Sequence, residues 1–129
     1  MAMRWFNSEK PRDIWDETIK GPIGDIEAAH KIRDICRSAA DSAAKVAGSA
    51  GRLDSKNRYE FERYKSAAKT AMTIAMKIAD DLLRDSAVRQ IVGLCLKADD
   101  LRTAGILFQG IQAASIREEV LQEHPILRQ

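Results

Sequence analysis

Apolar residues recur at helical spacing along almost the whole chain, and this periodicity constrains the fold more than any other feature of the sequence. No stretch alternates apolar and polar residues with the period of two that a half-buried strand shows. Beyond the N-terminal segment, turn-forming glycine and proline occur mainly at Gly21–Asp25, Gly48–Asn57 and Pro125. The sequence therefore predicts an all-α protein, a helical bundle of three to four main helices with a short N-terminal helix.

The length and charge of the chain favour one domain without a strong electrostatic target. A chain of 129 residues can bury an independent core. We expect residues 23–129 to form one helical-bundle domain, preceded by an aromatic segment over residues 1–22. With 21 basic and 19 acidic residues, the net charge of +2 attracts nucleic acid or anionic lipid only weakly. No run approaches the roughly 20 apolar residues of a membrane span, so we expect no membrane partner.

The two cysteines, Cys36 and Cys95, each lie in an apolar helical context without a neighbouring cysteine or histidine at metal-ligand spacing. This pattern indicates small buried hydrophobic residues in a reducing compartment rather than a disulfide. The N-terminus also lacks the apolar stretch of a secretory signal. We therefore expect a cytoplasmic protein.

Both tryptophans, Trp5 and Trp15, lie in the first fifteen residues. A short helix is predicted over Pro11–Ile19, because proline suits the first position of a helix. The segment is interpreted either as a lid that packs over one end of the bundle or as an aromatic peptide that docks on a partner. Tryptophan is a favoured anchor at protein interfaces, which supports the second interpretation.

Two amphipathic helices are predicted in the first two thirds of the chain, over Asp25–Ala47 and Asn57–Arg84. Asp25 is the expected N-cap of the first. Both apolar faces rely on alanine, which lets neighbouring helices approach closely, so we expect an antiparallel hairpin. The expected stripes are Ile32, Ile35, Cys36, Ala39, Ala43 and Val46 in the first helix, and Phe61, Tyr64, Ala68, Ala71, Met72, Ala75, Ala79 and Leu82 in the second.

From Ser86 to Glu123 the sequence permits one bent helix or two. In a continuous helix Asp99 falls on the apolar face, where an unpaired carboxylate is unfavourable. If a new helix begins near Asp99, that side chain caps it and Asp100 lies in the first turn. We therefore expect a break near Lys97–Asp99. A DNA-reading helix-turn-helix at this joint is disfavoured, because both carboxylates would face the phosphates.

The segment Thr103–Ile116 contains no charged residue, whereas a surface helix normally has a charged face. One apolar stripe can face the hairpin, but a second, offset stripe also needs a cover. The helix is therefore either central in its own bundle or part of a subunit interface, and we favour self-association. The glycines Gly105 and Gly110 would admit another backbone. The second stripe consists of Ile106, Gly110, Ala113, Ile116 and Val120.

Glu27 and His30 form a Glu-x-x-His pair, the spacing of ligands in di-metal helical bundles. Such a site needs a second pair of this kind and two more inward glutamates. The other histidine has leucine three residues before it, and Glu60 and Glu62 fall off the predicted apolar stripe. We expect His30 to point to solvent, and we expect neither a metal nor another cofactor.

The segment Ala29–Ala40 resembles the active helix of histidine-phosphotransfer domains, which are helical bundles of similar length. In that family an exposed histidine is followed by an apolar residue, a lysine, a glycine and a small residue. After His30, Ile32 and Arg33 fit this pattern, whereas Asp34 stands where the family has glycine. The resemblance implies phosphotransfer through His30 as one alternative function.

Lys65, Lys69 and Lys77, with Thr73 between them, recur on one face of the predicted helix Asn57–Arg84. Acidic residues interrupt this cationic row, and few aromatic residues accompany it for base stacking. A solvated face is the simpler interpretation, and a nucleic-acid accessory role is the second alternative function.

No nucleophile–base pair, phosphate-binding loop or inward acid pair is recognisable in the sequence, so we expect no enzymatic activity. The prediction is a non-catalytic interaction or assembly protein. We expect it to bind a second copy of itself or another protein through its C-terminal helical segment. The sequence does not identify that partner.

Overall fold

The computed structural model describes residues 13–16, 22–49 and 55–128. These residues form helices and no strand, so the prediction of an all-α bundle is confirmed. Three long helices pack together, and two shorter helices pack against the third of them. A single 3-10 turn lies near each end of the described chain. The elements are η2 (Ile14–Asp16), α1 (Asp25–Gly48), α2 (Ser55–Ala75), α3 (Asp81–Lys97), α4 (Leu101–Gln109), α5 (Ala114–Glu123) and η3 (Pro125–Leu127).

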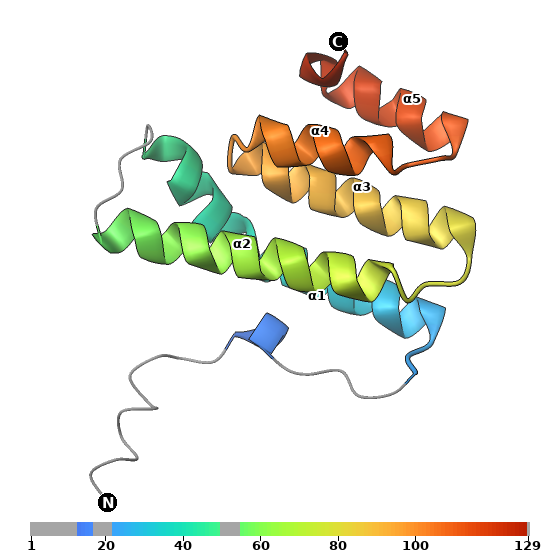
Figure 1. Cartoon of the computed structure of the whole chain (residues 1–129), viewed down its shortest axis with the longest axis horizontal. Helices are drawn as coiled ribbons and strands as arrows, with labels where there is room; N and C mark the ends of the chain where they lie inside the picture. The colour runs from blue at the N-terminus through green and yellow to red at the C-terminus, as the bar shows by residue number, and fades with distance from the viewer. Residues whose placement is uncertain (1–12, 17–21, 50–54, 129) are drawn as a thin grey trace, which may run out of the picture.

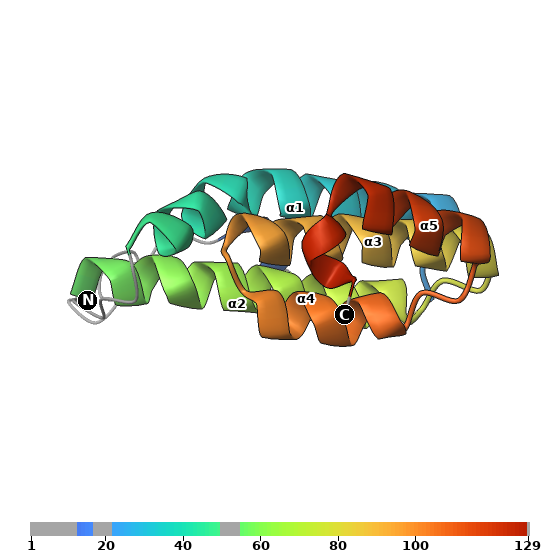
Figure 2. The same ribbon diagram turned by 90° about the horizontal axis from the view of Figure 1, so that it is seen from above.

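Helices α1 and α2 lie antiparallel, and α3 packs against both of them (Figure 1). The two short helices lie on the far side of α3 from η2. Seen from above, α4 lies on the α2 side of α3, and α5 lies on the α1 side (Figure 2). The short helices therefore form a second layer whose outer surface belongs to α4, α5 and η3.

Alanine fills the contact between the two long N-terminal helices, as the sequence predicts. Small side chains let the helix axes approach closely, and the larger isoleucines pack beside them. None of the described helices combines the length and apolar character needed to cross a lipid bilayer. The fully buried alanines of this contact are Ala28, Ala39, Ala43, Ala67, Ala71 and Ala75.

Helix α2 ends at Ala75, so the prediction of one helix as far as Arg84 is wrong. A new helix, α3, starts after Asp80, its N-cap, whose Oδ1 accepts the backbone N–H of Leu83 at 2.9 Å. Leu82, which the sequence places on the buried stripe, is consequently exposed.

Asp25 is the first residue of α1 rather than its N-cap, which is Gly24. Its carboxylate instead accepts the backbone N–H groups of Ala79 at 3.0 Å and Asp80 at 2.9 Å. These two hydrogen bonds lower the pKa of the Asp25 carboxyl. Asp25 therefore joins the start of α1 to the turn between α2 and α3.

The break expected near Lys97–Asp99 is confirmed, since α3 ends at Lys97 and α4 begins at Leu101. The capping residue is Asp100 rather than Asp99. Its Oδ1 accepts the backbone N–H of Thr103 at 3.2 Å. Asp99 has a φ of 60°, in the left-handed region that aspartate tolerates better than most residues. This conformation turns the chain sharply between the two helices.

The chargeless segment Thr103–Ile116 forms two helices, so the prediction that it is a single helix is wrong. Helix α4 ends at Gln109, Gly110 is its C-cap, and Ala113 is the N-cap of α5. The two apolar stripes that the sequence predicts are therefore not two faces of one continuous helix.

Asp85 holds the start of α5. This residue of α3 is only 1% exposed, and its Oδ2 accepts the backbone N–H groups of Gln112 at 3.1 Å and Ala113 at 2.9 Å. Asp85 thereby anchors the backbone that leads into α5, including the free N–H of its N-cap residue, Ala113.

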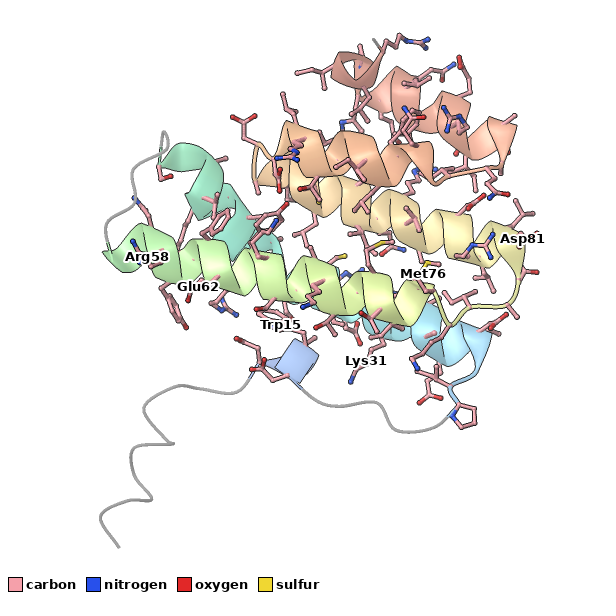
Figure 3. All side chains as sticks on the ribbon, in the orientation of Figure 1. Trp15, Lys31, Arg58, Glu62, Met76 and Asp81 are labelled. Atoms are coloured by element: carbon pink, nitrogen blue, oxygen red, sulfur yellow. The ribbon has the colours of Figure 1, made fainter. Side chains whose placement is uncertain are left out.

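Trp15, the middle residue of η2, is 4% exposed, and its side chain packs toward α2 (Figure 3). The guanidinium of Arg63 lies 5.0 Å from the centroid of its ring and pairs with Asp13 at 2.7 Å. The hydroxyl of Thr70 donates to the Trp15 carbonyl at 3.3 Å. Trp15 thus packs against the side of α2 in its own chain, whereas Trp5 lies outside the described residues.

Glu60 is buried, contrary to the expectation that it falls off the apolar face of its helix. Its Oε1 accepts a hydrogen bond of 2.7 Å from the Ser42 hydroxyl, and its Oε2 lies 3.6 Å from the ammonium group of Lys45. Nη1 of Arg63 also donates to the Ser42 hydroxyl at 2.7 Å. This polar network links α1 and α2 and continues to the Asp13–Arg63 ion pair.

Replacing Asp85 by alanine is expected to lower the free energy of unfolding by about 2–3 kcal/mol, because two part-buried N–H groups lose a charged acceptor. Urea denaturation measures this change. Asp81→Ala, which removes an exposed carboxylate from the same helix, serves as the matched control and should change stability by less than about 1 kcal/mol. An Asp85→Ala protein as stable as the parent would contradict the role of Asp85 at the start of α5.

Candidate functional site

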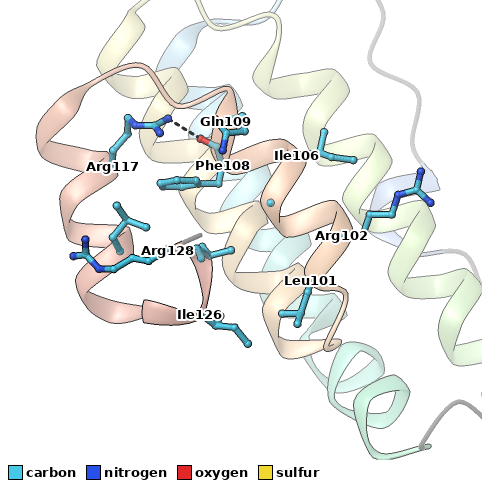
Figure 4. A pocket seen from close by; sticks show the side chains of 11 residues that line it. Leu101, Arg102, Ile106, Phe108, Gln109, Arg117, Ile126 and Arg128 are labelled. Atoms are coloured by element: carbon cyan, nitrogen blue, oxygen red, sulfur yellow. Dashed lines mark hydrogen bonds between the residues drawn. The ribbon is translucent and has the colours of Figure 1, made fainter.

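A groove with a volume of about 910 Å³ opens between α4, α5 and η3 (Figure 4). Its apolar lining includes Leu101 and Ile106 from α4, Leu121 from α5 and Ile126 from η3. We call it the C-terminal groove. It exists because α4 and α5 are separate helices, and because η3 folds the end of the chain back toward them.

Three large apolar side chains of the C-terminal groove are exposed to solvent. Ile106 is 61% exposed, Ile126 54% and Leu101 42%. A single exposed leucine or isoleucine is ordinary, but several around one hollow are typical of a binding surface. The groove therefore has the composition of a site for an apolar partner.

Arg117 forms part of the groove wall and fixes the spacing of the two short helices. Its Nη1 donates to the backbone carbonyls of Ile111 at 2.9 Å and Phe108 at 3.3 Å, and its guanidinium lies 4.5 Å from the Phe108 ring centroid. Phe108 lies in the last turn of α4 and Ile111 follows the helix, so the guanidinium lies at the C-terminal end of α4, where a positive charge is electrostatically favoured. Arg117 thus acts within the chain, and its donors are partly used.

The rim of the groove carries two further arginines. Arg102 is exposed and is in no ion pair within the described part of the chain. Arg128 lies 3.5 Å from Glu118. The rim is therefore cationic around an apolar hollow.

Gly105 lies in the middle of α4 and lines the groove. A Cβ atom built on it would have no atom within 4 Å, so nothing in the described structure requires glycine there. Glycine in a helix interior is less favourable than alanine by roughly 1 kcal/mol. Because Gly105 has no side chain, the space next to α4 at this position of the groove is open.

The residues expected to form one interface do not form one surface. Ile116 and Val120 are buried in the core of the chain, at 8% and 1% exposure. Gly110 and Ala113 lie in the joint between α4 and α5. Of the five, Ile106 alone presents a large side chain to the groove.

The sequence analysis missed Leu101, Leu121 and Ile126 as groove residues. Leu101 is the first residue of α4, a short helix that the sequence pattern does not separate from α5. Ile126 follows Pro125, and the apolar pair after this proline was the available signal that the C-terminus packs back on the protein.

The other candidate residues are apart from the groove. His30 is exposed on α1, as expected. Lys65 and Lys69 line a smaller hollow between α2 and α4, together with Thr103. Lys77 follows the end of α2, so the predicted cationic row is not on one continuous helix. Among the described residues, no cluster of three or more histidine, cysteine or acidic side chains could hold a metal ion.

Tyr64 of α2 contacts the start of α4, the helix that forms one wall of the groove. It is fully buried on α2, and its hydroxyl donates a hydrogen bond of 2.6 Å to Oδ2 of Asp100, the N-cap of α4. Burial, together with the hydrogen bond to Asp100, raises the pKa of the tyrosine. Burial acts to raise the pKa of Asp100 as well, but hydrogen bonds from Tyr64 and Thr103 outweigh it and hold that pKa below its usual value.

Neither the family models, nor the curated proteins, nor the solved structures with which the chain was compared gave a match.

Replacing Gly105 by alanine is expected to raise the free energy of unfolding by about 0.5–1 kcal/mol, because alanine is the better helix former and its methyl group meets open space. Thermal or urea unfolding measures the gain. Gly110→Ala is the control and should not give the same gain in stability. The Cβ atom of an alanine at this position would lie only 3.3 Å from the Leu107 carbonyl oxygen. Loss of stability in Gly105→Ala would show that the space is not open.

Acid should remove a specific contribution of Asp100. Because its pKa is lower in the folded than in the unfolded chain, the carboxylate stabilises the fold above pH ~4, and this contribution is lost as the pH falls through the folded-state pKa. Asp100→Asn is expected to lower the free energy of unfolding at pH 7 by about 1 kcal/mol and to flatten its decline toward acid pH. Asp99→Asn, which removes the neighbouring exposed carboxylate, is the control and should keep the stability of the parent at pH 7 in chemical denaturation.

Proposed function

We propose that this protein is a non-catalytic interaction and assembly protein that associates with a second copy of itself through the C-terminal groove. The observation that carries the proposal is the exposure of Ile106, Ile126 and Leu101 around one hollow. Burying these side chains against a partner would remove apolar surface from water, which is the dominant driving force of association.

The shape of the groove suits association between identical copies. A two-fold interface brings the same patch of each subunit together, so the patch needs both protruding groups and a recess. Ile106 protrudes, and the open space over Gly105 lies in the same lining. Ile106 of each copy would enter the groove of the other.

The two free cysteines support the proposed cytoplasmic location. Cys95 is buried and Cys36 half-buried, and neither forms a disulfide. Burial, and to a lesser extent the neighbouring Cys95, raises the pKa of the Cys36 thiol to about 12, so it is protonated and unreactive at neutral pH.

Phosphotransfer through His30 and nucleic-acid binding through the lysines stay predictions that no contact of these side chains favours.

Ile106→Asp is the variant that tests the proposed function. A carboxylate in the apolar contact would be desolvated without a partner, so we expect the dimer dissociation constant to rise about 10-fold or more. Sedimentation velocity over a range of protein concentrations measures the constant, and circular dichroism checks that the helices persist.

Ile26→Asp is the matched control, because Ile26 is 67% exposed but lies in the first turn of α1. It should leave the dimer unchanged. A parent protein that stays monomeric at all concentrations would refute self-association. Dissociation by Ile26→Asp and not by Ile106→Asp would place the interface elsewhere.

A further inference from the structure

A second hollow, of about 670 Å³, lies between α1 and α3, on the α1 side of the molecule. We call it the α1–α3 pocket. Its walls are mainly apolar and include Cys36 and Ala40 of α1 with Leu94 and Leu96 of α3. His124, which follows α5, also lines it. Its size is within the roughly 300–1,000 Å³ of small-molecule sites, which are likewise mostly apolar with a few polar groups.

Three cations converge on this pocket. Arg33 and Arg37 are one turn apart on α1, and Lys97 is the last residue of α3. No carboxylate is among the residues that line the pocket. Like charges four residues apart on a helix repel each other, and an anion bound between them would relieve this repulsion.

Some cations of the described chain are in ion pairs and others, such as Arg102, are not. Arg63, Arg84, Arg89 and Arg128 each lie within 4.0 Å of a carboxylate. In the part of the chain that the structure describes, the cations Arg33, Arg37 and Lys97 take part in no ion pair. All three are exposed at the rim, where a ligand can reach them.

Gly93 lies inside α3 and lines the same pocket. A Cβ atom on this residue would have no atom within 4 Å, so packing within the described chain does not require glycine. A side chain at this position would extend into the hollow. Gly93 therefore keeps the apolar part of the pocket open at a position where almost any other residue would favour the helix more.

We propose that the α1–α3 pocket binds a small anionic amphiphile, a carboxylate or phosphate monoester joined to an apolar chain. The anion would bind to Arg33, Arg37 and Lys97, whose guanidinium and ammonium groups form charge-assisted hydrogen bonds with such oxygens. The apolar chain would lie over Gly93, between the walls of α1 and α3. This site is separate from the C-terminal groove and does not depend on self-association.

Titration of the isotope-labelled 129-residue chain with four ligands of one chain length tests the proposal by NMR. Octanoate and octyl phosphate carry the anion, and octanol and octylamine carry a neutral and a cationic group. We expect octanoate or octyl phosphate to give saturable shifts at Gly93 and Arg37, with octanol at least about 10-fold weaker and octylamine without effect. The stronger of the two anions identifies the head group that the site prefers.

Two variants of the pocket and one control variant separate binding in the pocket from adventitious binding. Gly93→Leu fills the pocket and should abolish anion binding, whereas Gly105→Leu, the same substitution in the C-terminal groove, should leave it unchanged. Arg33→Gln with Arg37→Gln should weaken octanoate about 10-fold and leave octanol unaffected. Circular dichroism establishes that each variant is folded.

Equal affinity for octanol and octanoate would overturn the proposal, because the pocket would then be an apolar hole without anion recognition. Unchanged binding in Gly93→Leu would overturn it by placing the ligand elsewhere. No saturable shifts with either anion would likewise refute it. None of these results bears on the dimer, whose test uses Ile106.

Discussion

The free backbone N–H groups at the starts of the helices are the constraint on which the rest of this structure depends. A helix leaves its first four N–H groups without intrahelical acceptors, and this chain has several short helices with many such starts. Aspartate carboxylates supply acceptors at the joints, and two of them act on an element other than their own. Asp80 and Asp100 cap their own helices, whereas Asp25 of α1 binds the turn before α3 and Asp85 of α3 binds the start of α5.

The interaction of Asp85 has the largest consequence for the surface. Because it holds the start of α5, the chargeless C-terminal segment bends back instead of continuing as one helix. Ile116 and Val120 then enter the core, while Ile106 on α4 remains outside. The C-terminal groove is the space between the two arms of this bend, closed at one side by η3. A buried carboxylate thus decides which apolar residues are available to a partner.

The two hollows share one physical feature, a glycine inside a helix whose missing side chain leaves space rather than admitting a neighbour. Gly105 on α4 opens the C-terminal groove, and Gly93 on α3 opens the α1–α3 pocket. Their surroundings differ, since protruding isoleucines line the first, whereas no large apolar side chain exposed to solvent is among the residues that line the second. The first environment suits a protein surface, and the second suits a small ligand with an anionic head.

The helical class, the alanine-rich contact of α1 with α2 and the break before α4 could all be predicted from the sequence. These features follow from local periodicity and from aspartates whose placement on an apolar face is unfavourable. The sequence did not determine that α2 ends at Ala75, that Glu60 is buried or that Ile126 lines a groove. The tertiary structure alone decided these, because they depend on partners distant in the chain: Asp85 binds N–H groups 27 and 28 residues away, and Ser42 binds Glu60 across 18 residues. Helical spacing identifies which residues share a face of one helix. It cannot show which side chain of a distant helix will bind the backbone where that helix begins or ends.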